Sequence, residues 1–78
     1  MKSVEELRAT IESLLEDAGF SPELYVIKTY VGAIAVHFDD EGAVHYFKKE
    51  VDGSPYKDDV IFEYRREGKR HVAYIQMW

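Results

Sequence analysis

The chain has no cysteine, which excludes disulfide bonds, thiolate metal sites and a cysteine nucleophile. It also lacks a long apolar run. The longest, from Val31 to Val36, falls far short of the roughly 18 residues that a membrane span requires. The N-terminus leads directly into a charged segment and shows no apolar signal-peptide core. These absences, together with the missing cysteine, predict a soluble, cytoplasmic protein without a membrane partner.

Basic residues are also in the minority. Ten lysines and arginines stand against 15 acidic residues, so the formal net charge is −5. Binding to phosphate backbones or to anionic membranes requires positive potential, which this balance does not favour. We therefore expect no nucleic-acid partner. A protein with a basic surface is an electrostatically more favourable partner for this acidic chain than a phosphate backbone is.

The residues that are present predict one small folded domain over 1–78. Of the 78 residues, 46% are hydrophobic, which is typical of a globular chain and too high for a disordered one. A chain of this length has room for a single core.

A helix is predicted from about Val4 to Ala18. Ser3 and Glu6 have the spacing of a capping box, in which each side chain accepts from the backbone N–H of the other. The apolar residues that follow have helical spacing and form one face: Val4, Leu7, Ile11, Leu14, Leu15 and Ala18. Gly19 is suited to the position that ends the helix.

The rest of the chain is predicted to form strands, because it is rich in Val, Ile, Tyr and Phe and is divided by turn residues. A curved first strand with a bend at Gly32 is favoured over two strands joined at Val31-Gly32, which remains an alternative. Asp40–Gly42 and Arg66–Gly68 are interpreted as hairpin loops. The four predicted strands are about Leu24–Asp39, Ala43–Val51, Asp59–Arg66 and Lys69–Trp78.

The predicted fold class is therefore α+β, with one N-terminal amphipathic helix packed on a curved four-stranded antiparallel β-meander. This element order resembles that of cystatin-like folds. The likeness concerns the order of elements alone, and fold does not determine function.

The strand sequences suggest a binding surface. Ala33–Val36 and Val72–Ile75 are apolar on both sides of the strand, and one helix can cover only one face of a four-stranded sheet. The candidate residues for an uncovered face that binds a protein partner or a second copy are Tyr46, Tyr64, Tyr74, Met77 and Trp78. The alternative is a strongly curved sheet whose aromatic residues complete the core around the helix.

Three histidines are candidates for a metal site. The predicted hairpin registers place His37 opposite His45, and Glu63 opposite His71. Two imidazoles and a carboxylate form the ligand set of an open zinc site. The more ordinary interpretation is that these histidines face solvent or pair with Glu63 across the strands.

Charged clusters permit two further hypotheses. A basic patch for phosphate would combine Arg65, Arg66, Lys69, Arg70 and His71 with Lys48 and Lys49. Charges at hairpin ends, however, also keep sheet edges from pairing with other chains. The acidic residues of the helix and of 39–41 would let the protein mimic a nucleic acid as an inhibitor, although a charged helix face is usually just solvated.

No motif indicates catalysis. The serines lack a nearby His or Asp pattern, and the chain has no Gly-rich phosphate loop and no metalloprotease spacing. We therefore expect a non-catalytic interaction module without a cofactor or a small-molecule substrate. A designed or functionless scaffold is an alternative, favoured by the capping box and the Gly turns. The loop from Asp52 to Asp58, the three histidines and the two-sided apolar strands argue against it.

Overall fold

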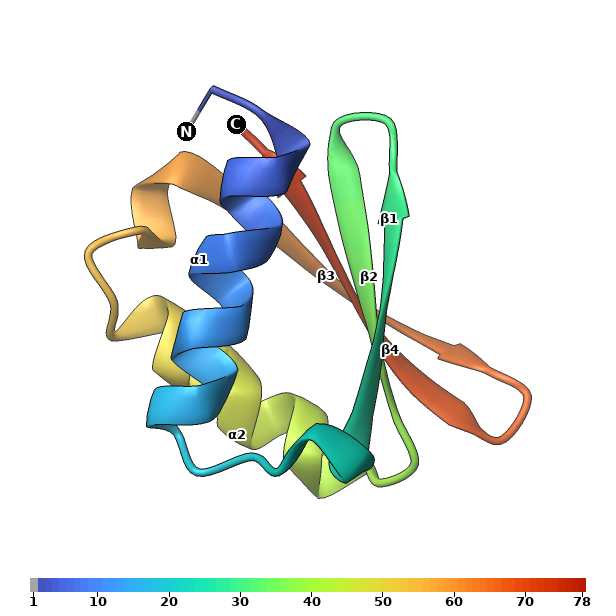
Figure 1. Ribbon diagram of the computed structural model, residues 1–78. Helices are drawn as coiled ribbons and strands as arrows, with labels where there is room; N and C mark the ends of the chain where they lie inside the picture. Colours follow the sequence, from blue (N-terminus) through green and yellow to red (C-terminus); the bar gives the residue numbers. More distant parts are fainter. Residues whose placement is uncertain (1) are drawn as a thin grey trace.

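The computed structural model describes residues 2–78 as two helices and a four-stranded sheet (Figure 1). In chain order the elements are α1 (Val4–Asp17), η1 (Pro22–Leu24), β1 (Tyr25–Tyr30), β2 (Ala33–Phe38), α2 (Glu41–Asp52), η2 (Lys57–Asp59), β3 (Val60–Glu67) and β4 (Arg70–Met77). The predicted α+β class is confirmed, with an N-terminal helix on an antiparallel four-stranded sheet. The chain thus contains an α-β-β unit twice.

The second helix, α2, corrects the prediction of a strand over Ala43–Val51 and of a hairpin loop at 40–42. The helical spacing of the apolar residues in this segment outweighs their individual preference for strands. Val44, Phe47 and Val51 recur at intervals of three and four residues, and all three are buried against the core. Burying this apolar stripe fixes the helix, because tertiary packing overrides local propensity.

The sheet order is β1-β2-β4-β3, with every neighbouring pair antiparallel. The meander is therefore wrong, since β4 lies between β2 and β3, and the second helix also departs from the cystatin-like element order. The predicted first strand is a hairpin: Val31-Gly32 joins β1 to β2, and Gly32 has a φ of 71°. A positive φ is a conformation that glycine adopts without steric cost.

Both helices pack on the same face of the sheet (Figure 1). α1 lies over β1 and β2, whereas α2 contacts β2 and β4. The core between the helices and the sheet consists of Leu7, Ile11, Leu15, Ile34, Val36, Phe38, Val44, Phe47, Val51, Val60, Ala73 and Ile75. Phe47 is the centre of an aromatic cluster, with ring centroids 5.8 Å from those of Phe38 and Phe62.

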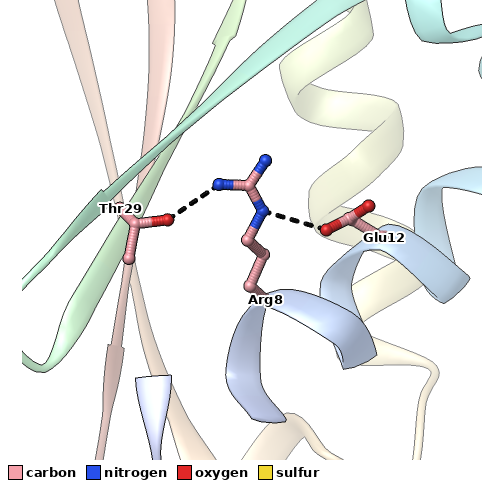
Figure 2. A network of polar contacts seen from close by, with 3 residues as sticks. All are labelled: Arg8, Glu12 and Thr29. Atoms are coloured by element: carbon pink, nitrogen blue, oxygen red, sulfur yellow. Dashed lines mark hydrogen bonds and ion pairs between the residues drawn. The ribbon is translucent and has the colours of Figure 1, made fainter. Parts of the chain in front are cut away.

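A polar contact also fixes α1 over the sheet (Figure 2). Arg8 on α1 donates from Nε to Glu12 at 3.0 Å and from Nη1 to the Thr29 hydroxyl on β1 at 2.9 Å. The helix begins at the predicted residue, with the Ser3 hydroxyl accepting from the Glu6 N–H at 3.2 Å, whereas the Glu6 carboxylate accepts from the Lys2 N–H at 3.0 Å and not from the Ser3 N–H that the capping box predicts. Gly19 follows the helix with a positive φ, so both predicted boundaries hold to within a residue.

Candidate functional site: the open face of the sheet

The face of the sheet opposite the helices, here called the open face, is covered by no element within residues 2–78 (Figure 1). Successive strand residues point to opposite faces, so the strand registers define which side chains lie there. They form three rows across β1, β2, β4 and β3: Val26–His37–Val72–Arg65, Lys28–Ala35–Tyr74–Glu63, and Tyr30–Ala33–Gln76–Ile61.

The centre of the open face is dry although no helix covers it. Ala35 and Val72 are fully buried, and His37 is only 5% exposed. Larger side chains on the neighbouring strands shield these residues. The flanks are exposed instead, with Val26 at 46%, Tyr30 at 49% and Ile61 at 42%. The open face therefore combines a sealed apolar floor with accessible apolar and aromatic edges.

A polar network crosses one half of the open face. The Tyr74 hydroxyl donates to Glu67 Oε2 at 2.6 Å, so the Tyr74 side chain extends along the sheet past the row of Val72. The Arg65 guanidinium lies 4.9 Å from the Tyr74 ring centroid and pairs with Glu63 at 2.9 Å. The bond to the Glu67 carboxylate raises the pKa of Tyr74, because it favours the protonated phenol.

His37 is the one buried polar residue of the described core, and neither of its ring nitrogens has a hydrogen-bond partner. Burial, and then the positive charges of Lys28 and Arg70, lower the pKa of His37. Leaving buried polar atoms unpartnered costs about 1 to 3 kcal/mol. The ring therefore has an unused capacity to donate and to accept a hydrogen bond.

A shallow groove beside Tyr74 completes the surface. It has a volume of about 370 Å³ and is lined by Ile61, Phe62, Glu63, Tyr74 and Gln76. A second groove, of about 330 Å³, lies elsewhere, where the end of α1 approaches the start of α2.

The five residues predicted to form one binding face do not lie together. Tyr74 lies on the open face, whereas Tyr64 and Met77 point to the helix side and pack against the core. Tyr46 is on α2 and lines the second groove. Trp78 follows β4 and is 87% exposed, and its backbone N–H donates to the Asp59 carbonyl at 2.9 Å. Tyr74 is therefore the member of the predicted set that the open face contains.

The predicted basic patch is also divided. Arg65 and Arg70 lie on the open face, Lys69 is in the β3–β4 turn, and Arg66 pairs with His71 across the strands on the helix side. Lys48 pairs with Asp52 at 2.8 Å within α2. The charges therefore do not converge on one phosphate-sized site.

The predicted histidine pairing is wrong because His45 lies on α2. The register pairs Glu63 with Tyr74 and pairs His71 with Arg66. His71 and His45 both approach Tyr64, whose hydroxyl lies 2.7 Å from His71 Nδ1. His37 is on the opposite face. Within residues 2–78, no three His, Asp or Glu side chains come close enough to hold a metal ion.

Sequence reasoning did not identify the flanking residues of the open face, among them Val26, Lys28 and Tyr30, nor the small residues of its floor. The usable signal was the alternation in Ala33–His37, where two alanines and a histidine share one face. Small residues in the middle of a sheet reduce the height of a face and permit close approach by another surface.

Comparisons with known proteins do not assign a family. No family model, no curated protein and no solved structure matches the chain. None of the helices within residues 2–78 is long and apolar enough to cross a membrane. The geometry of the open face is therefore the basis for any functional assignment.

Proposed function

We propose that this chain is a small non-catalytic binding module that engages a protein partner through the open face. The observation that carries the proposal is the placement of both helices on one face of the sheet, which leaves Val26, Tyr30 and Ile61 exposed on the other. Exposed apolar and aromatic side chains gathered on one face of a sheet are typical of interaction sites.

The charge of the open face favours a protein over a nucleic acid. Three basic residues, Lys28, Arg65 and Arg70, are interspersed with the acidic Glu63 and Glu67. Phosphate backbones attract proteins through concentrated positive charge, which this mixture does not provide. Mixed charges around an apolar centre are typical of the polar rim of a protein interface.

One local feature provides specificity. The groove beside Tyr74 has the size to accept an inserted partner side chain, and inserted anchors supply most of the binding energy at protein interfaces. The ring nitrogens of His37 are sealed from the surface, so His37 belongs to the floor of the open face and makes no contact with a partner.

The test uses two tyrosines of equal exposure on opposite sides of the molecule. Tyr30 on the open face is 49% exposed, and Tyr46 on α2 is 50% exposed. Each is replaced in turn by a photoreactive benzophenone amino acid in the full chain, in the cells that produce it. Irradiation followed by mass measurement should give a discrete covalent adduct from position 30 and little from position 46.

Equal adduct yields at the two positions, or none at either, would contradict the proposal. The adduct mass also identifies the kind of partner, since a second copy adds 9.1 kDa and any other protein adds a different mass.

A further inference from the structure

Two of the three rows of the open face, the middle row and the row of Tyr30 and Ile61, match their own reversed order when the face is turned over. This inference rests on the proposed function and concerns the identity of the partner. Two sheets that stack face to face lie about 10 Å apart with their strands roughly aligned. Two copies of one chain can meet in this way around a two-fold axis that runs either along the strands or across them.

The direction of the axis determines which residues meet. With the axis across the strands, β1 lies over β1 of the other copy, so residues of the middle row face themselves and Lys28 faces Lys28. With the axis along the strands, the row level is kept and the strand order is reversed. The outer strand β1 then lies over β3, and β2 lies over β4.

Charge favours the axis along the strands. Lys28 and Glu63 occupy the two ends of the middle row, so this axis places each lysine over the glutamate of the other copy. Both residues are exposed, and Lys28 has no ion pair with another residue from Lys2 to Trp78. Opposite charges facing one another favour the correct register, and like charges disfavour the alternative.

Size favours the same axis. The exposed Gln76 comes to lie over the half-buried Ala33, so that a long side chain meets a small one at this level of the sheet. In the outer row Tyr30 meets Ile61, which brings together two of the exposed apolar side chains of the flanks. Alternating large and small residues across facing positions allow two surfaces to interdigitate.

The available area is compatible with a dimer of modest affinity. Four strands of six to eight residues give a face of roughly 15 to 20 Å by 20 to 26 Å. Two such faces together bury roughly 600 to 1,000 Å², and the upper end of this range reaches the lower limit for a specific interface. We propose that a second copy of the chain covers the open face, with a two-fold axis along the strands that places Lys28 of each copy over Glu63 of the other.

The experiment is a charge exchange followed by sedimentation. The wild-type chain is expected to dimerise within a concentration series from roughly 1 µM to 1 mM. Lys28→Glu should weaken the dimer at least tenfold, because it creates two repulsive contacts, and Glu63→Lys should do the same. Lys49→Glu and Glu16→Lys make the same charge changes on exposed helix positions and should leave the dimer unchanged.

The decisive sample is a mixture of the two single variants. Lys28→Glu carries two glutamates at the paired positions and Glu63→Lys carries two lysines, so both contacts are attractive only between unlike chains. The mixture should form a heterodimer, and the double variant should recover wild-type association to within about threefold. Unfolding curves of each variant confirm that the chains are folded.

A dimer that ignores all four substitutions would overturn the arrangement. A wild-type chain that remains monomeric at 1 mM would overturn self-association. In that case an adduct from position 30 with a mass other than that of a second copy would still support the proposed function, and the absence of any adduct would contradict both.

Discussion

The two faces of the sheet are built differently although they share the same four strands. On the helix side, large residues such as Ile34, Phe38 and Ile75 interdigitate with two helices and are sealed. On the open face the same central strands present Ala33, Ala35 and Val72, with long side chains at the flanks. One face is built for packing within the chain, and the other has a low centre between chemically mixed edges.

This difference shows how a small chain can be stable while retaining an apolar surface. The free energy of folding comes mainly from apolar area buried between the helices and the sheet. The open face can therefore carry a buried histidine and exposed apolar residues without loss of the fold. Substitutions on the two faces should consequently have unequal effects on stability.

The largest expected effect is on the helix side. Phe47→Ala should lower the free energy of unfolding by about 3 to 5 kcal/mol, because it leaves a cavity within the aromatic cluster. Urea denaturation, at a protein concentration where the chain is monomeric, gives the value. Tyr30→Ala on the open face is the contrasting variant and should cost under about 1 kcal/mol. Equal losses at the two positions would mean that the open face belongs to the folding core.

The sequence predicts α1, the strands β3 and β4, and the class of the fold because these features depend on local signals. The capping box at Ser3 and the glycine after the helix act within a few residues of themselves. The segment 41–52 was misread because Gly42 resembles a hairpin glycine and the flanking residues are β-prone. Its apolar positions have helical spacing, but their burial against β2 and β4 depends on tertiary packing, which local sequence patterns do not specify.

The candidate site depended on strand order and register, which local patterns do not determine. The apolar run Ala33–Val36 of β2 is readable from the sequence, whereas β4 carries Arg70, Tyr74 and Gln76 beside Val72 on its open side, and a second helix covers the other face of the sheet. Most individual residues of the site were not predicted, because the strand register was wrong. Assigning Arg66 and Glu67 to a loop shifted the register, which separated Glu63 from its true neighbour Tyr74. A shift of this kind changes every cross-strand partner.

The next largest effect is expected at His37. Replacing it with leucine keeps the apolar contacts of the floor and removes two unpartnered ring nitrogens. We expect the free energy of unfolding at neutral pH to rise by about 1 to 2 kcal/mol. Urea denaturation again measures the change. A loss of stability would indicate that the imidazole makes favourable interactions in the monomer.

The same variant isolates a pH effect. The folded-state pKa of His37 is lowered, so below about pH 6.5 the unfolded chain takes up a proton more readily than the folded chain. Wild-type stability should therefore fall as the pH decreases from that value, until the folded state is protonated as well. The difference between the wild-type and His37→Leu curves should show this loss, and parallel curves would contradict it.

A smaller effect is expected at the turn between β1 and β2. Gly32 has a φ of 71°, and a Cβ at this position would meet no atom within 4 Å. Gly32→Ala should therefore cost only the backbone strain, about 1 kcal/mol. Gly32→Asn should cost less, because asparagine tolerates the left-handed region. Thermal unfolding of the two variants checks the order, and a larger loss for asparagine would be inconsistent with strain as the cause.

The smallest effect concerns the polar network of the open face and leaves the fold intact. The Glu67 carboxylate holds the proton on the Tyr74 hydroxyl and so raises its pKa above the usual value near 10. Glu67→Gln keeps an acceptor but removes its charge, so one tyrosine should titrate at lower pH in the phenolate absorbance. Glu16→Gln on α1 is the control and should reproduce the wild-type curve. Superimposable curves for Glu67→Gln and wild type would mean that Tyr74 does not bond Glu67 in solution. The Tyr74 side chain would then not be held in place over Val72.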